Sequence, residues 1–257
     1  MEMNVEQITA LRTIVVSTGQ DTNTAKTTVA KFLTGFLRRK GVDAKHIMID
    51  LPGNPSDGED LRLTGMEDDF QALIEEVMLM DDDQLAIIDL GGHAFEKYMQ
   101  SAKVFGDRSH GDAGLFVVPL MPNVKEQVVL ATVDQFISLG VDPKRIVLLF
   151  TRVDEAADNH IVTRFAGLKK AAAEFGFRVC SVPLYFASII QDVRGTPLDL
   201  YELAALDREE AKRELQESRK ANDGRTVDIA GKMILSDKAL RPVLNFNNVF
   251  AEVLGGQ

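Results

Sequence analysis

The chain of 257 residues contains a single cysteine, Cys180, so an internal disulfide is excluded. Low cysteine usage is typical of a reducing compartment, and we expect a cytoplasmic location. Cys180 lies within an apolar run, which indicates a buried structural thiol rather than a nucleophile.

Long apolar runs are absent as well. No run approaches the roughly 18 residues of a membrane-spanning helix, and no basic-then-apolar leader follows Met1. We therefore expect neither a membrane span nor a secretory signal. Acidic residues outnumber basic ones: the chain has 39 Asp and Glu and 29 Lys and Arg, which gives a net charge of −10. This excess of acidic residues argues against a protein that binds nucleic acid over its whole surface, although a local basic patch stays open.

Short apolar runs alternate with helical patterns, which is typical of parallel βαβ units. The expected strands are Thr13–Ser17, His46–Asp50, Leu85–Leu90, Leu115–Leu120, Ile146–Phe150 and Arg178–Val182. The expected helices are one that carries Val29 to Leu37 and ends at Gly41, then Phe70–Leu79, Ala94–Val104, Val124–Leu139, Thr163–Phe175, Asp207–Lys220 and Val243–Leu254. We predict an α/β fold in which helices flank both faces of a mostly parallel sheet of about seven strands.

We expect one α/β domain over residues 1–257, with a C-terminal helical part, about 203–257, packing on it. Within that part, Asp207–Lys220 places Glu three and four residues from Lys or Arg, which stabilises an exposed helix. Two interpretations of this charged helix stay open: a solvated surface helix, or an arm that docks a partner.

Residues 14–28 have the pattern of a phosphate-binding loop, in which a buried strand and a short loop precede Lys26, Thr27 and Thr28 at a helix start. Backbone N–H groups and a helix N-terminus hold the phosphates in such loops. The lysine contacts the terminal phosphates, and the next hydroxyl ligates Mg²⁺. The expected nucleotide-binding residues are Asp21, Thr22, Asn23, Thr24, Ala25, Lys26, Thr27 and Thr28.

The loop lacks two glycines of the standard pattern, because Gln20 and Ala25 stand in their places. Asn23 can replace one of them, since asparagine adopts positive φ readily. Ala25 is tolerated at negative φ and costs about 1 kcal/mol or more at positive φ. The alternative is an ordinary helix start that Thr22 or Thr24 caps.

Two carboxylates stand at the ends of expected strands, Asp50 after the second and Asp89 after the third. Ligands of open α/β sheets bind beyond the carboxyl ends of the strands, where an Asp followed by small residues suits a Mg²⁺ and γ-phosphate site. We therefore expect Thr27, Asp50 and Asp89 to hold Mg²⁺, and Lys26, Asp50 and Asp89 to form the catalytic set. The alternative for each Asp is a helix cap or a loop carboxylate.

The fifth expected strand leads into Thr151-Arg152-Val153-Asp154, which resembles the Asn-Lys-x-Asp box that holds guanine in GTPases. Thr151 replaces the Asn and Arg152 replaces the Lys. We include Thr151 and Asp154 among the candidate nucleotide-binding residues. The alternative is a strand-to-loop junction in which Asp154 caps a turn.

On these motifs the chain resembles the ParA/MinD group of deviant Walker ATPases of the SIMIBI class, and within it the StbB-like plasmid stability proteins. The likeness spans roughly residues 10 to 190. The matching positions are Gln20, Lys26, Thr27 and Thr28 in the loop, Asn23 as in StbB-like loops, Asp50 and Asp89 after strands, and Pro119 with Met121-Pro122 at the fourth strand.

Two positions depart from the family pattern. Asp21 stands where the signature lysine normally reaches the partner subunit's phosphates, and Pro52 stands where a second Asp normally positions water. A carboxylate at Asp21 repels phosphate, and Pro52 cannot position an attacking water. Hydrolysis is therefore expected to be slow.

The resemblance implies a nucleotide-gated ATPase that binds ATP, or GTP, with Mg²⁺. It also implies a role in plasmid, DNA or cargo maintenance and positioning through a protein partner, either a DNA-binding adaptor or the cargo. Whether the chain forms a homodimer stays open. Direct nucleic-acid binding stays open. Two other classes also stay open: a pseudo-NTPase adaptor that does not bind nucleotide, and a GTPase-like switch.

Overall fold

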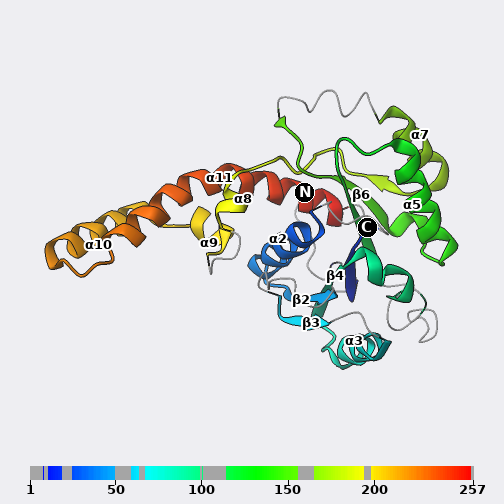
Figure 1. Ribbon diagram of the computed structural model, residues 1–257, viewed down its shortest axis with the longest axis horizontal. Coiled ribbons are helices and arrows are strands. Elements are labelled where there is room, and N and C mark those ends of the chain that lie inside the picture. Colours follow the sequence, from blue (N-terminus) through cyan, green and yellow to red (C-terminus); the bar gives the residue numbers. More distant parts are fainter. Residues whose placement is uncertain are drawn as a thin grey trace. The chain divides into compact units, whose positions relative to one another are not determined.

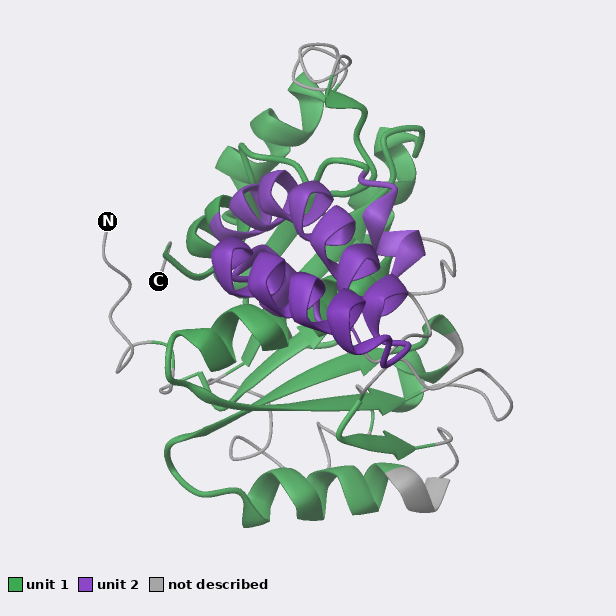
Figure 2. Cartoon of the chain, turned by 90° about the vertical axis from the view of Figure 1, so that its left-hand side faces the viewer, with its two compact units in different colours: residues 1–186, 248–257 green, residues 187–247 purple. Residues whose placement is uncertain are grey.

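The computed structural model describes residues 8, 11–18, 25–49, 59–63, 67–98, 100, 114–155, 165–193 and 198–255. The chain divides into two compact units, one of residues 1–186 and 248–257 and the other of residues 187–247 (Figure 2). None of the helices in the described ranges combines the length and the apolarity that a bilayer crossing requires.

The first unit is built on a seven-stranded sheet in which every strand pairing is parallel (Figure 1). Its strands are β1 (Thr13–Val16), β2 (Asp43–Ile49), β3 (Leu61–Leu63), β4 (Gln84–Leu90), β5 (Gly114–Leu120), β6 (Ile146–Phe150) and β7 (Arg178–Val179). Their spatial order is β3-β2-β4-β1-β5-β6-β7. The predicted fold class, an α/β protein with a parallel sheet and flanking helices, is confirmed.

The helices of this unit are α2 (Lys26–Arg39), α3 (Glu67–Leu79), α5 (Glu126–Ser138), α7 (Ala166–Phe175) and the final turns of α11 (Thr226–Gly255). The bounds of each of the first four lie within three residues of the predicted bounds. The helix expected over 94–104 begins instead as a short 3₁₀ turn, η1 (Gly92–Ala94), and its last residues lie outside the described part. The edge strand β3 was not predicted.

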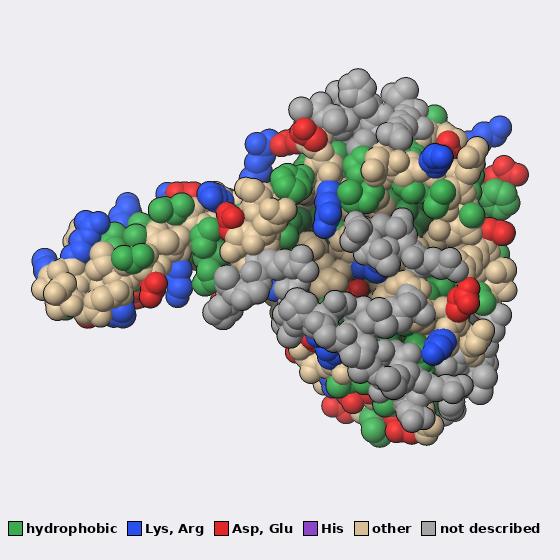
Figure 3. All heavy atoms as spheres, viewed as in Figure 1, with side chains coloured by type: hydrophobic (Ala, Val, Ile, Leu, Met, Phe, Trp, Pro, Cys, Tyr) green, Lys and Arg blue, Asp and Glu red, His purple; other side chains and the backbone are tan. Residues whose placement is uncertain are grey.

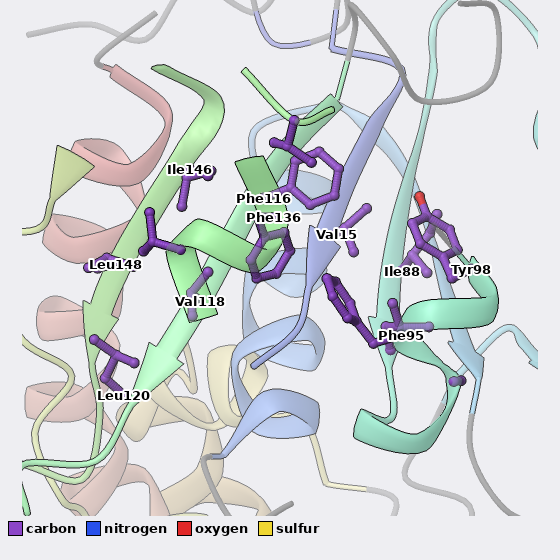
Figure 4. Close-up of a cluster of buried hydrophobic side chains, with 14 of the residues drawn as sticks. Val15, Ile88, Phe95, Tyr98, Phe116, Val118, Leu120, Phe136, Ile146 and Leu148 are labelled. Carbon is purple, nitrogen blue, oxygen red and sulfur yellow. The ribbon is translucent and has the colours of Figure 1, made fainter. Parts of the chain in front are cut away.

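Side chains of one face of the sheet form a large apolar cluster (Figure 4). The cluster takes alternate residues of each strand, because successive side chains of a strand point to opposite faces. The strand members include Val15, Ile47, Ile49, Ile88, Leu90, Phe116, Val118, Ile146 and Leu148, and helices α3, α5 and α7 cover them. Phe136 of α5 packs edge-on against Phe95 and Phe116, with ring centroids 4.6 and 5.6 Å apart.

Helix α2 covers the opposite face of the sheet, where it lies against β1, β2, β4 and β5. Its apolar residues recur at helical spacing and are buried: Val29, Phe32, Leu33, Phe36 and Leu37. The end of α11 reaches this layer too, since the rings of Phe36 and Phe250 lie 5.7 Å apart. The sheet is therefore covered on both faces, which explains why its strands are almost wholly apolar.

The second unit is helical, with α8 (Ile189–Asp192), α9 (Leu200–Ala204), α10 (Arg208–Ala221) and most of α11. Asp207 caps α10 by accepting hydrogen bonds from the amides of Glu209 and Glu210. Asn222 follows the last residue of α10 and adopts the left-handed region at φ +51°, a common way for a helix to end. The helix ends one residue beyond its predicted end at Lys220. An ion pair between Arg208 and Asp237 joins α10 to α11 on the two sides of this turn.

Helix α11 is much longer than predicted. The predicted helix began at Val243, directly after Pro242, and proline seldom lies inside a helix. In the structure α11 begins at Thr226 and runs through Pro242.

Candidate functional site

The exit of β1 leads into the candidate phosphate-binding loop. All four residues of β1 are buried, and the two hydroxyl residues that follow, Ser17 and Thr18, are buried as well. The amide of Ser17 donates to the carbonyl of Val117 on β5, at 3.1 Å. Buried hydroxyls directly after an apolar strand are unusual, since polar side chains are seldom buried without a specific role.

Lys26 is the first residue of α2, and only 8% of its surface is exposed. Its Nζ donates a hydrogen bond to Oγ1 of Thr18, at 3.3 Å. Lysine is rarely buried to this degree, because removing an ammonium from water is costly unless it is paired. The buried lysine is therefore held at the exit of β1, as the phosphate-loop prediction requires of Lys26.

Backbone strain marks the residue before this lysine. Ala25 adopts φ +64° and ψ +26°, the left-handed conformation that glycine favours. The condition for a tolerated alanine, a negative φ, is not met, and the conformation costs about 1–2 kcal/mol. Strained residues of this kind often occur at ligand-binding loops.

The N-terminus of α2 is electropositive. No acidic residue stands in its first turn, and Ala25 provides no side-chain cap. Thr27 and Thr28 are half-buried in that turn. The free amides of a helix start carry a partial positive charge, to which Lys26 adds a full one. An anion is the natural complement of this arrangement.

Asp89 lies on β4, the strand next to β1, and is paired in register with Val16. Its side chain is 3% exposed. Because Ile88 and Leu90 belong to the cluster on the opposite face, Asp89 faces the layer of α2. Asp89 thus lies next to β1 on the face of the sheet that is covered by α2, the helix that begins at Lys26.

Several predicted site residues lie outside the described residues: Asp21, Thr22, Asn23, Thr24 and Asp50. Their roles stay predictions. Among the residues that the structure describes, no group of three or more His, Cys, Asp or Glu is arranged to hold a metal ion. The chemistry of the described residues nevertheless fits Mg²⁺, which is usually held by one or two carboxylates together with phosphate oxygens and water.

Thr151 to Asp154 follow β6, two strands from β1 and therefore about 10 Å from it along the sheet. Thr151 is buried, and both its amide and its hydroxyl donate to the carbonyl of Leu120, at 2.8 and 3.3 Å. Arg152 adopts φ +54°, a second strained position at the carboxyl edge of the sheet. Asp154 is exposed.

Two features of this edge were missed from the sequence. Thr18 holds Lys26, and Glu252 near the end of α11 accepts hydrogen bonds from the amides of Ser181 and Val182, at 2.6 and 3.1 Å. The polar pair Ser17-Thr18 after an apolar strand was a usable signal for the first. Nothing local in the sequence indicates the second, because 70 residues separate the partners.

Neither a scan against protein-family models nor a search of curated proteins finds a match to this chain.

Proposed function

We propose that this chain is a Mg²⁺-dependent nucleotide-binding switch of the ParA/MinD/StbB kind. It would hydrolyse ATP slowly and act in the maintenance and positioning of plasmid DNA or another cargo through a protein partner. The observation that carries the proposal is the buried ammonium of Lys26 at the start of α2, with Asp89 on the strand next to β1 and on the face that α2 covers. The ammonium of Lys26 and the N-terminus of α2 would bind the phosphates there.

The described residues have distinct roles in this proposal. Lys26 would bind the β- and γ-phosphates. The hydroxyl of Thr27 and the carboxylate of Asp89 would hold the metal, with Asp50 as the expected further carboxylate. Bound Mg²⁺ neutralises phosphate charge. Nucleotide would order the loops around the site and so control a partner-binding surface.

A protein partner is supported by the helical unit. α11 exposes the apolar side chains of Val227, Ile234, Leu240 and Leu244. In the space-filling view, apolar and charged side chains are interspersed along α10 and α11 (Figure 3). Exposed apolar residues gathered on one element are common at docking surfaces. A second copy of the chain, the homodimer that the sequence leaves open, is another occupant of such a surface.

The test is nucleotide binding by the purified chain, measured as a thermal shift and by calorimetry with ATP and GTP, with Mg²⁺ or with EDTA. The wild type should bind with Mg²⁺, and Lys26→Ala should lose binding while its circular dichroism stays unchanged. Lys40→Ala is the matched control, because Lys40 is exposed at the other end of the same helix. A wild type that shows no shift at millimolar nucleotide would refute the proposal.

A GTPase-like switch is the second candidate. The observation that favours it is the loop Thr151–Asp154, which leaves the sheet at β6 with Arg152 in a strained conformation. A preference for GTP that Asp154→Ala removes would support it. The adaptor alternative is favoured by the residues that depart from the loop pattern of the family, Asp21, Ala25 and Pro52, and it predicts no binding of either nucleotide.

A further inference from the structure

The segment that contains α3 carries charge of one sign only. Residues 64–83 include eight Asp and Glu and no Lys, Arg or His. The rest of the chain is nearly balanced, with 31 acidic residues for 29 basic ones. Most of the net charge of −10 therefore comes from this one segment.

The fold itself uses two of these acids. Arg12 forms an ion pair with Asp82, and Lys45 forms one with Glu76. Three further acids of the segment are exposed and have no ion pair with any residue that the structure describes: Glu75, Asp81 and Asp83. Their charge is therefore not balanced by the described part of the chain.

The charge at the end of α3 also opposes the helix dipole. The carbonyls of a helix C-terminus carry a partial negative charge, which basic residues stabilise. Helices α2 and α10 follow this rule, since each has two basic residues in its last turn. The last turn of α3 has none, and Asp81 follows its last residue, Leu79, by two positions. The stability of α3 therefore does not explain why carboxylates stand here.

Two large apolar side chains are exposed beside these carboxylates. Met78 is 58% exposed, and Leu79 is 82% exposed, more than any other large hydrophobic side chain that the structure describes. Their neighbours in the chain, Val77 and Met80, are buried. Glu75 lies three and four residues before the exposed pair, and so on the same side of the helix. An exposed apolar pair with a polar rim is common where a protein binds a partner.

This surface lies away from the candidate phosphate site. We call it the α3 patch and define it by five residues: Glu75, Met78, Leu79, Asp81 and Asp83. The end of α3 leads directly into β4, so the patch lies toward the amino edge of the sheet. Lys26 follows β1 and lies at the carboxyl edge. A ligand of the α3 patch therefore does not compete with phosphate for the same edge.

We propose that the α3 patch docks a cationic amphipathic segment of a protein partner, in which Lys or Arg residues flank an apolar side chain. The apolar side chain covers Met78 and Leu79, and the flanking cations meet the carboxylates and the carbonyl end of α3. The flexible side chain of Met78 can adapt to the shape of its partner.

The charge of the α3 patch disfavours other occupants. Nucleic acid is repelled, because its phosphates carry the same sign of charge. A two-fold pair of copies joined through this patch would place like charges opposite each other. The inference goes beyond the proposed nucleotide-binding function and does not depend on it.

The test measures the Kd of the full chain for three labelled synthetic peptides of equal length, by fluorescence anisotropy at low and at high salt. The first peptide places Leu and Lys on opposite faces of a helix, the second replaces its Lys by Glu, and the third replaces its Leu by Ser. The Leu–Lys peptide should bind and the Leu–Glu peptide should not. The Lys–Ser peptide should bind about tenfold or more weakly than the Leu–Lys peptide, because it buries no apolar side chain.

Variants of the chain locate the binding surface. Leu79→Ser should weaken binding of the Leu–Lys peptide about tenfold or more, and Phe175→Ser is the control at another exposed apolar position. The double variant Asp81→Asn with Asp83→Asn should weaken binding at low salt and reduce the dependence of Kd on salt. Its control removes the same charge from exposed positions of α10, by Glu214→Gln with Glu217→Gln. Thermal unfolding confirms that each variant is folded.

Four outcomes would overturn the proposal. The wild type does not bind the Leu–Lys peptide, or it binds the Leu–Glu peptide as tightly. Leu79→Ser binds the Leu–Lys peptide with the affinity of the wild type. In sedimentation velocity, the wild type is a dimer that Leu79→Ser dissociates, which would make a second copy the occupant of the α3 patch.

Discussion

The ammonium of Lys26 donates a hydrogen bond to the hydroxyl of Thr18, with 3.3 Å between Nζ and Oγ1. This bond joins the start of α2 to the second residue after β1, so the two ends of the connecting segment are held together. It explains how a lysine side chain comes to be buried at the edge of an apolar sheet. Ala25, the residue before Lys26, has a left-handed backbone with φ +64°.

We expect Ala25→Gly to raise the free energy of unfolding by about 0.5–1 kcal/mol. Glycine relieves the left-handed strain of φ +64°, and this gain exceeds the added freedom of the unfolded chain. Urea unfolding measures the change. Ala205→Gly is the control, because Ala205 has φ −93° and glycine should only destabilise there. Equal destabilisation at both positions would contradict the strained conformation of Ala25.

We expect stability to fall in mild acid because of His46 on β2, whose side chain is 1% exposed. Burial lowers the pKa of His46 from 6.5 to about 4, although the carboxylates of Asp60 and Glu59 oppose this shift. The unfolded chain therefore binds this proton at a higher pH than the folded chain does. The contribution of a neutral His46 is complete above about pH 6.5 and is lost as the pH falls to about 4, on the order of 3 kcal/mol in total.

The measurement is the free energy of unfolding between pH 4 and 7 for the wild type and for His46→Gln. Carboxylates titrate in the same range, so the difference between the two proteins isolates the histidine. The difference should narrow or reverse toward pH 4, because only the wild type has to protonate a buried imidazole. Parallel curves would show that His46 does not carry this pH dependence.

In the helical unit, the buried hydroxyl of Ser218 organises the turn between α10 and α11. It donates to Oδ1 of Asp223 at 2.5 Å and lies 3.0 Å from the hydroxyl of Thr226. We expect Ser218→Ala to destabilise the protein by about 1 kcal/mol, the usual contribution of a lost buried hydrogen bond. Gln216→Ala, at an exposed position of the same helix, should change stability by less than about 0.5 kcal/mol.

The same substitution has an electrostatic readout. The hydroxyl of Ser218, followed by the amide and guanidinium of Arg225, lowers the pKa of Asp223 to about 2. In Ser218→Ala this pKa should rise toward its ordinary value of 3.8, which an NMR titration of the carboxyl carbon detects. An unchanged pKa would mean that the hydroxyl does not donate to Asp223.

The spacing of apolar residues along the chain and the composition of short apolar runs were sufficient to predict most of the strands and helices. β6 has its predicted bounds, and β4 and β5 each begin one residue earlier than predicted, because buried parallel strands are nearly continuous apolar runs. β3 was missed, since three residues with a central Arg62 carry no periodic signal. The early part of α11 was missed, since the helix runs through Pro242 and proline seldom lies inside a helix.

Some features of the candidate site could likewise be predicted from the sequence, and others could not. The place of Lys26 at a helix start and of Asp89 on a buried strand followed from local pattern. The sign of φ at Ala25 and the burial of Lys26 did not, because neither is set by neighbouring residues alone.

By itself the sequence determined the alternation of strands and helices. Apolar residues recur with a period of about 2 in strands and about 3.6 in helices, and both periods can be read from their order along the chain. Only the tertiary structure decided which strand exits are neighbours, because spatial order follows from how the crossovers pack and not from order along the chain. That packing sets Asp89 beside the exit of β1 and Tyr185 beside Val153. It also lets Glu252 bind the amide of Val182 near the carboxyl edge, although 70 residues separate the two in sequence.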